Sequence, residues 1–324
     1  MTDSAPRPEF SIQPATEREI RDNQATDVTF FRTAQNPNIL VLDFATLRDQ
    51  GAMFNRVGAF SEKLGQPHDH VLTDDELTKA IQVAGDTPET YYYGHDYSSA
   101  TLVRFFALAD RDKIALNTQE ERLRRLLRQE GLFDPAKVVG LITIPRADSN
   151  PGVSRGDRSA ILRHELSHGE YFSNPAFAEF VHRFWTRTLN QPERDHLIAY
   201  LKSQGYDTTL PELMENEAQA YLVFTLDPAF FTAAMVRMTE DRRTALRGSP
   251  RWHSRCALPR VRRRPPATRP PGANSTSATS QWSASATASS TASRPWSVGP
   301  TRAWAPFPPP SSSQSPRNPP RGRR

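Results

Sequence analysis

The amino-acid composition changes abruptly near residue 242, and this change limits which part of the chain can fold. From residue 242 to the end there is no Asp, Glu, Lys, Ile, Tyr or Met, whereas Arg, Pro, Ser, Thr and Ala dominate. Such a segment buries too little apolar surface to offset the entropy lost on ordering. We therefore expect a folded domain over residues 36–248 and a disordered Arg/Pro/Ser-rich tail over residues 249–324. A frame-shifted reading of GC-rich DNA would give this bias; the alternative is a genuine interaction tail.

The charge divides at nearly the same place. Residues 249–324 carry 13 Arg and no acid, so the formal net charge of +5 for the whole chain leaves −8 for residues 1–248. The positive charge therefore lies outside the segment that can present a shaped surface, and we predict no nucleic-acid partner. An arginine-rich tail that binds nucleic acid is an alternative, and its affinity would fall steeply with salt.

Cysteine usage and hydropathy are typical of a soluble protein in a reducing compartment. The single cysteine, Cys256, lies in the tail, so no intramolecular disulfide is possible and the folded domain has no cysteine ligand or nucleophile. The first twenty residues lack the apolar run of a signal peptide, and no stretch approaches the length of a membrane span. We expect a cytoplasmic protein with no membrane partner. A start codon assigned too far downstream would hide a signal, so a periplasmic or secreted location stays open.

Local patterns predict a small sheet followed by a mainly helical region, which is the α+β class. The polar residues 1–35 are expected to form a flexible N-terminal lead-in, and the aromatic segment 89–99 is expected to form a turn. Segment 99–110 suits either a strand or a helix. Clearer patterns predict strands at 38–44 and 137–145, an amphipathic helix at 117–132, and a series of helices from residue 155 to 247.

The stretch HELSH at residues 164–168 carries the chemistry of the folded domain. Positions i and i+4 of a helix stand on one face about one turn apart, so His164 and His168 can direct imidazole nitrogens at one point. This spacing suits a single Zn²⁺, and Glu165 then lies beside the metal, where it can take a proton from a zinc-bound water. The histidines continue the apolar face of Ile161 and Tyr171, which argues against a solvated helix.

Catalytic zinc usually has three protein ligands, so a third ligand is expected downstream. Glu217 falls on the apolar stripe of segment 210–224, whereas Glu215 and Gln219 lie about 200° round the helix, on the side expected to be polar. A buried carboxylate without a partner is costly, and metal ligation compensates it. The alternative is a Glu217 paired with an inward arginine or with Tyr221. The predicted zinc ligands are His164, His168 and Glu217.

The combined pattern resembles the gluzincins, the thermolysin-like clan of zinc metallopeptidases. In that clan a second helix supplies a glutamate ligand, often within the pattern NE-A, and NEA stands here at residues 216–218. The resemblance covers residues 138–225 and only a few specific positions. It implies a zincin-like catalytic region that hydrolyses peptide bonds of a peptide or protein substrate. It also implies His164, His168 and Glu217 as zinc ligands and Glu165 as the general base.

The sequence departs from the thermolysin pattern at one informative position. Four residues after the ligand glutamate, that pattern has an aspartate directed at the first histidine. Here the position is Tyr221, so the group that orients the histidine is not predicted. The metzincin pattern is excluded, because it requires Gly and His where Tyr171 and Asn174 stand. An aspzincin arrangement with Asp207 as third ligand is an alternative. Gly169, inside the helix, is expected to permit close backbone packing.

Attack on a peptide carbonyl also requires a hydrogen-bond donor for the developing oxyanion. We favour His196, on a helix, and Tyr206, in the loop before the helix of the third ligand, because such donors often lie on loops or facing helices. His95 could line a substrate cleft, whereas His68 and His70 are expected in a solvated loop. The other candidate donors are Tyr171, His182, Tyr200 and Tyr221.

The leading hypothesis is therefore a zinc metallopeptidase. The alternative is a non-catalytic, zinc-stabilised or partner-binding protein that keeps the metal ligands without turnover. The presence of Glu165 favours the enzyme, because a purely structural zinc site has no use for a base. These patterns do not fix the substrate, endo- or exopeptidase action, or the oligomeric state.

Overall fold

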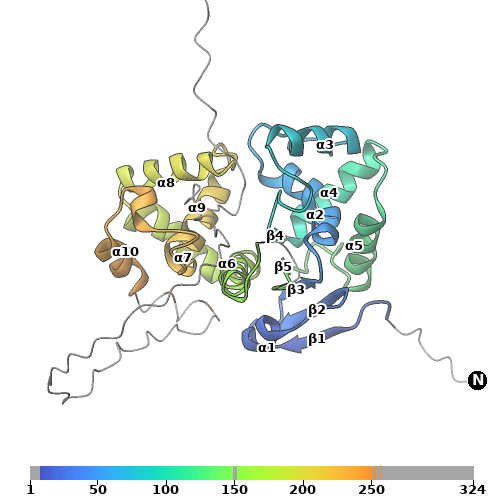
Figure 1. Ribbon diagram of the computed structural model, residues 1–324, viewed down its shortest axis with the longest axis horizontal. Helices are drawn as coiled ribbons and strands as arrows, with labels where there is room; N and C mark the ends of the chain where they lie inside the picture. Colours follow the sequence, from blue (N-terminus) through green and yellow to red (C-terminus); the bar gives the residue numbers. More distant parts are fainter. Residues whose placement is uncertain (1–7, 149–151, 250–251, 253–255, 257–324) are drawn as a thin grey trace, which may run out of the picture.

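A five-stranded mixed sheet with helices on both faces forms the centre of the computed structural model, which describes residues 8–148, 152–249, 252 and 256 (Figure 1). This architecture confirms the expected α+β class. The spatial order of the strands is β1-β2-β3-β5-β4, with β1 parallel to β2, β3 parallel to β5, and antiparallel pairs elsewhere. The strands are β1 (Ile12–Ala15), β2 (Val28–Thr33), β3 (Ile39–Phe44), β4 (His95–Ser98) and β5 (Gly140–Pro145).

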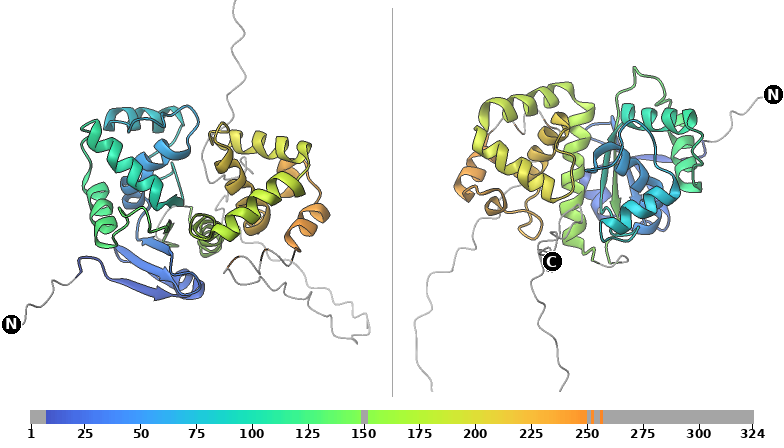
Figure 2. Two further views of the ribbon diagram at one scale, coloured as in Figure 1. Left: turned by 180° about the vertical axis from the view of Figure 1, so that it is seen from behind. Right: turned by 90° about the horizontal axis from the view of Figure 1, so that it is seen from above.

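Two groups of helices enclose the sheet, and the views in Figure 2 show them on opposite sides of the strands. One group is α2 (Leu47–Glu62), α3 (Asp74–Val83), α4 (Ser99–Arg111) and α5 (Thr118–Gln129). The other begins with α6 (Arg155–Ser173) and continues with α7 (Pro175–Arg183), α8 (Gln191–Ser203), α9 (Pro211–Gln219) and α10 (Glu240–Arg247). Turns of π-helix follow α7 (Phe184–Thr188) and α9 (Ala220–Phe224), and a 3-10 turn covers Ala233–Val236. The last helix of the predicted series, at residues 227–247, is therefore divided into this short turn and α10.

Strand β3 has apolar residues on both faces of the sheet, and each face is covered by one of the two groups of helices. Its alternate residues Ile39 and Val41 belong to the core beneath α6, whereas Leu40 and Leu42 belong to the core beneath α2, α4 and α5. Every residue of β3 is buried as a result. A strand covered on both faces is expected to be apolar along its whole length, as this one nearly is.

Residues 8–35 differ from the predicted flexible lead-in. They form β1, helix α1 (Glu17–Asp22) and β2, which belong to the sheet and its edge. A reciprocal capping box between Thr16 and Glu19 starts α1, and Ile20 on the inner side of this helix is fully buried. The prediction was wrong because these short elements are stabilised by pairing and capping rather than by a long apolar pattern.

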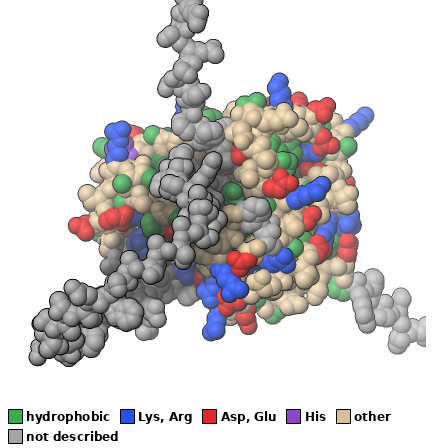
Figure 3. Space-filling view, viewed as in Figure 1, with side chains coloured by type: hydrophobic (Ala, Val, Ile, Leu, Met, Phe, Trp, Pro, Cys, Tyr) green, Lys and Arg blue, Asp and Glu red, His purple; other side chains and the backbone are tan. Residues whose placement is uncertain are grey.

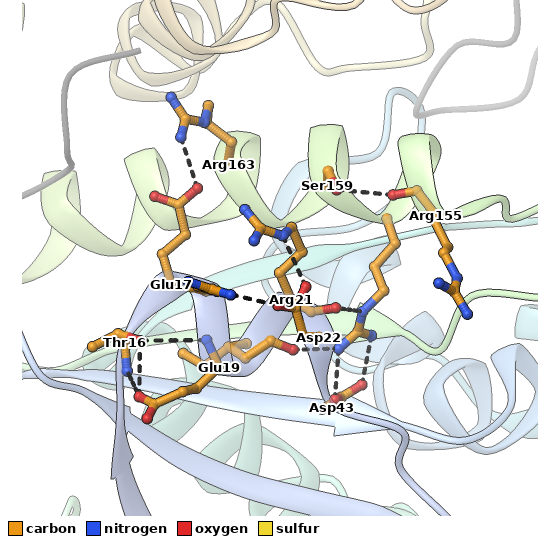
Figure 4. A network of polar contacts seen from close by, with 12 residues as sticks. Thr16, Glu17, Glu19, Arg21, Asp22, Asp43, Arg155, Ser159 and Arg163 are labelled. Carbon is orange, nitrogen blue, oxygen red and sulfur yellow. Dashed lines mark hydrogen bonds and ion pairs between the residues drawn. The ribbon is translucent and has the colours of Figure 1, made fainter. Parts of the chain in front are cut away.

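An ion pair in the first turns of α6 fixes that helix to the sheet. The Arg158 guanidinium donates to both carboxylate oxygens of Asp43 at 2.7 Å, and also to backbone carbonyls of Ile20, Arg21 and Pro145. Figure 4 shows α1 held against α6 beside this pair, with Glu17 facing Arg163. Since all five N–H donors of a guanidinium can be used this way, its burial is compensated.

Two glycines let α6 approach the sheet closely. A Cβ on Gly140 of β5 would lie 2.7 Å from the carbonyl oxygen of Gly169, and a Cβ on Gly169 would lie 2.8 Å from Ile39 Cγ2. The close backbone packing expected at Gly169 is therefore confirmed. It brings the middle of α6 directly over β5 and β4.

The folded domain extends beyond the boundary predicted at residue 248. Trp252 is fully buried among Phe177, Phe180, Phe184 and Phe224, with ring centroids 4.6–6.1 Å from its own, and its indole nitrogen donates to the carbonyl of Leu246. Cys256, also buried, donates its backbone N–H to Trp252. The prediction was wrong here because a bulky aromatic can anchor a segment of otherwise unfavourable composition. The rest of the predicted tail lies outside the described residues.

Basic and acidic side chains are interspersed on the face seen in Figure 3. Within the described part of the chain, no helix combines the length and apolar character needed to cross a membrane.

Candidate metal centre

The two histidines of HELSH lie on the face of α6 that packs against the sheet and α9. A capping box between Ser154 and Asp157 begins the helix, and the helix continues without interruption through His164 and His168 to Ser173. The exposed fractions of the two histidines are 2% and 0%. The prediction of a helix with inward histidines is therefore confirmed.

Glu217 of α9 faces both histidines. Its Oε2 lies 3.8 Å from His164 Nε2, and its Oε1 lies 3.7 Å from His168 Nε2. Three ligands about 2.1 Å from one tetrahedral ion would have donor atoms about 3.4 Å apart, close to these separations. His168 Nε2 and both Glu217 oxygens are buried and have no hydrogen-bond partner among the described residues. These residues therefore fit a zinc ion, and they are among the groups whose geometry could hold a metal.

Thr225 orients the first histidine. Its hydroxyl donates to the carbonyl of Ala220 at 3.0 Å and lies 2.8 Å from His164 Nδ1, so it accepts the N–H of that ring nitrogen. The opposite nitrogen, Nε2, is then the unprotonated one and faces Glu217. Thr225 directly follows the π-helical turn after α9 and lies eight residues beyond Glu217. The thermolysin pattern has its orienting residue only four positions beyond the ligand glutamate, so it did not point to Thr225.

Asp96 of β4 lies on the other side of the second histidine from Glu217. Its Oδ1 lies 3.7 Å from His168 Nδ1, so each histidine has an oxygen on its Nδ1 side and Glu217 on its Nε2 side. Segment 89–99 was predicted to be a turn, but residues 95–98 form the edge strand of the sheet. Alternation along this strand sends His95 and Tyr97 toward Phe54 of α2, and Asp96 toward α6.

Glu165 occupies a space that Gly94 leaves open. A Cβ at residue 94 would lie 2.2 Å from Glu165 Oε1 and 2.8 Å from its Cδ. The side chain of Glu165 is 3% exposed, and its Oε2 has no hydrogen-bond partner in the described structure. A carboxylate held beside the histidine pair with a free oxygen has the arrangement that a general base needs.

Four carboxyl groups lie close together here, three of them buried and that of Asp96 12% exposed, and their pKa values reflect this crowding. Burial raises the pKa of Glu165 and of Glu217 far above the usual range, and the charge of Asp96 adds to both shifts. Burial raises the pKa of Asp96 to about 7. Burial and the charge of Asp96 raise the pKa of Glu62 to about 8, although Lys63 opposes this shift. Such crowding is costly without a compensating cation.

Tyr206 lies at the cluster, as expected for one of the two favoured donors. A short antiparallel bridge joins it to Lys63, with the Asp207 N–H donating to Glu62 and the Leu64 N–H donating to Gly205. Burial and the neighbouring acids, first among them Glu217, raise the pKa of Tyr206, so its hydroxyl stays a donor.

His196, the other favoured donor, is half-buried on α8, and no contact among the described residues joins it to the cluster. Tyr221 lies closer, with its ring centroid 4.9 Å from that of His164. Tyr221 stands four residues after Glu217, so helical spacing already placed it on the side of that residue, whereas His196 lies on another helix.

The remaining residues considered in the sequence analysis contact groups other than the histidine pair. Asp207, the aspzincin alternative, binds His68 at 3.0 Å and Thr209 at 2.7 Å, away from the histidine pair. His68 also contacts the Phe60 carbonyl, so it is not the freely solvated side chain that was expected. Glu215 and Gln219 were expected on a polar face, but both are buried, because α7 and α6 cover that side of α9. Glu215 pairs with His182 at 3.0 Å.

No family model matches the sequence, and comparison with curated proteins and with solved structures gives no match either. The resemblance to gluzincins therefore stays a prediction, and the chemistry of the site depends on its own geometry.

Proposed function

We propose that this protein is a gluzincin-type zinc peptidase whose metal is held by His164, His168 and Glu217. One observation supports the proposal. Two imidazole nitrogens of α6 and the Glu217 carboxylate of α9 converge in a buried cluster, and Glu165 lies beside them with an oxygen that has no hydrogen-bond partner among the described residues. A zinc ion bound there supplies Lewis acidity, which polarises a peptide carbonyl and makes a water molecule more acidic.

The chain's own residues have distinct tasks in this proposal. The Glu165 carboxylate accepts a proton from the attacking water and passes it to the leaving amine. Thr225 and Asp96 hold the two imidazole rings in orientation, which keeps their Nε2 atoms directed at one point. The Tyr206 hydroxyl, beside Glu217, donates to the oxyanion that develops on the carbonyl.

The metal ligands are tested by elemental analysis of the full chain purified without chelator. We expect about one zinc per chain in the wild type, as for a three-ligand catalytic site. Glu217→Gln should lose most of it. Glu215→Gln is the matched control, because Glu215 is a buried carboxylate of the same helix that pairs with His182 instead. A folded wild-type protein without zinc would rule out the metal centre.

The reaction is tested with Glu165→Gln and a mixture of fluorogenic peptides. This variant should keep its zinc and lose at least a hundredfold in rate, since a general base contributes about 10²–10⁴-fold. A variant as fast as the wild type would refute the role of Glu165. Zinc binding without hydrolysis of any peptide by the wild type would favour the non-catalytic alternative.

A further inference from the structure

The turn that ends at Thr225 has an unusual pattern of backbone hydrogen bonds. Residues Ala220–Phe224 form a π-helical turn directly after α9, and Thr225 follows them. In an α-helix the Thr225 N–H would donate to the carbonyl of Tyr221, four residues earlier. Here it donates to the carbonyl of Ala220, five residues earlier, at 2.8 Å. Because π-helical turns are rare and often lie at functional sites, we looked for the contact that favours this one.

The guanidinium of Arg243, on α10, binds the carbonyls that this turn leaves without a helical donor. Its Nη2 donates to the carbonyl of Tyr221 at 3.2 Å and also to the carbonyl of Thr225, and its Nε donates to the carbonyl of Leu222 at 3.1 Å. In the α-helical form the N–H of Thr225 would supply the Tyr221 carbonyl instead. A buried carbonyl without a donor is costly, so the guanidinium favours the π-helical form over the α-helical one.

Arg243 is itself buried, with an exposed side-chain fraction of 4%. Besides the turn, it donates from Nη1 to the carbonyl of Phe231 at 3.3 Å. The nearest carboxylate, that of the exposed Glu240, lies 4.0 Å away. The buried charge is therefore compensated chiefly by backbone carbonyls, which fix the position of the peptide groups that carry them.

The same arrangement recurs at the other π-helical turn, Phe184–Thr188, which follows α7. There the N–H of Leu189 donates to the first residue of the turn at 3.1 Å. Arg194 Nη1 donates to the carbonyls of Trp185 at 3.0 Å and of Leu189 at 2.6 Å. These are the second residue of the turn and the residue directly after it, the same two positions that Arg243 Nη2 binds. The turn after α7 carries no residue of the metal cluster, so it provides a natural comparison.

We propose that Arg243 is a positioning residue of the metal centre, which holds the turn after α9 in its π-helical form and thereby places the Thr225 hydroxyl at His164 Nδ1. An α-helical turn winds more tightly, so without the guanidinium the hydroxyl would face another direction. The effect on zinc rests on the proposed function, whereas the effect on the His164 ring does not require a metal.

Zinc affinity of the full chain, measured by competition with a chelating dye, is the first test. Arg243→Met removes the donors and should weaken zinc binding about tenfold or more, as when the partner of a ligating histidine is lost. Arg194→Met makes the matched change at the other turn and should leave the affinity unchanged. Arg243→Lys keeps the charge but not the planar fork, so it should lose part of the affinity. Equal losses in Arg243→Met and Arg194→Met would indicate general destabilisation and refute the assignment.

Combination with Thr225→Val separates positioning from a merely structural role. A residue that acts through the Thr225 hydroxyl has little left to position once that hydroxyl is gone. We therefore expect Arg243→Met to change the zinc affinity of Thr225→Val by less than about threefold, because effects that share one contact are not additive. Losses that multiply in the double variant would contradict action through Thr225.

The His164 ring provides a readout without zinc. In metal-free protein labelled with ¹⁵N-histidine, chemical shifts report which ring nitrogen carries the proton, and loss of the signal in His164→Gln assigns it. The wild type should carry it on Nδ1, whereas Arg243→Met should mix the two tautomers as Thr225→Val does. A wild-type tautomer in Arg243→Met would overturn the proposal. If Arg243→Met does not fold, Arg243→Lys takes its place in each comparison. A wild type that binds no zinc would contradict the proposed function, and the tautomer would still decide this inference.

Discussion

Gly94 has no side chain, and the space this leaves is occupied by Glu165, the proposed general base. Any side chain there would overlap the Glu165 carboxylate, whose Oε1 lies 2.2 Å from the position of a Cβ. Neither the glycine nor its neighbour Asp96 carries a signal in the sequence, because both contacts join residues about 70 positions apart along the chain.

We expect Gly94→Ala to keep its zinc and to lose at least a hundredfold in hydrolysis rate, since it displaces the base and not the ligands. Elemental analysis and peptide hydrolysis measure the two effects. Gly156→Ala is the control, because a Cβ there meets only Ser154 Oγ at an ordinary 3.5 Å. Full activity in Gly94→Ala would show that Glu165 is not held where the reaction needs it.

Thr225→Val replaces a hydroxyl with a methyl group of similar size at the residue that orients His164. We expect zinc affinity to fall about 10- to 100-fold, as is typical when the partner of a ligating histidine is lost. Competition with a chelating dye measures the dissociation constant. Thr225→Ser keeps the hydroxyl and should bind zinc nearly as the wild type does; an unchanged affinity in Thr225→Val would contradict the role.

At the scale of elements, the helices and strands that could be predicted are those with a strong periodic or apolar sequence pattern. Helices α5 and α6 and strands β3 and β5 have long periodic or apolar sequences, and they were predicted. Helix α2 was not, because it buries Gln50, Asn55 and Arg56 where an amphipathic pattern would have apolar residues. Strand β4 has only four residues and is defined by pairing with β5. The spacing pointed to His164, Glu165, His168 and Glu217, which the structure brings together, whereas Thr225 and Asp96, which contact the two histidines, depend on tertiary contacts.

The close contact between α6 and β5 can be tested by comparing alanine substitutions at Gly140 and Gly169. Gly140→Ala pushes a Cβ against the Gly169 backbone, which cannot move without shifting the helix, so we expect a loss of about 1–3 kcal/mol in the free energy of unfolding. In Gly169→Ala the nearest atoms to the new Cβ belong to the Ile39 side chain, and the change gains about 1 kcal/mol in helix propensity, so its net cost should be smaller. Urea unfolding measures both; the reverse order would contradict this packing.

At the scale of the whole molecule, the core reaches past the point where the composition changes. Composition averages over many residues, so it could not reveal that one tryptophan fills a pocket between α7 and the turn after α9. The folded domain therefore includes part of the segment that was predicted to be disordered.

We expect Trp252→Ala to cost about 3–5 kcal/mol in the free energy of unfolding, the usual range for removing a fully buried aromatic side chain. Trp252→Phe should cost less, because it keeps most of the ring contacts and loses the indole hydrogen bond. Thermal or urea unfolding of the full chain provides the measurement. A stability equal to that of the wild type in Trp252→Ala would place the domain boundary before this residue.

The position of Thr225 so far along the chain has a consequence for biosynthesis. While the protein is being made, the histidine pair leaves the ribosome well before Glu217, and the π-helical turn that orients His164 follows later still. A nascent chain thus offers a metal ion two unoriented imidazoles until nearly the whole domain has emerged. In the proposed zinc peptidase, the complete ligand set and the hydroxyl that orients it therefore exist only in the nearly finished domain, so we expect tight metal binding to follow folding.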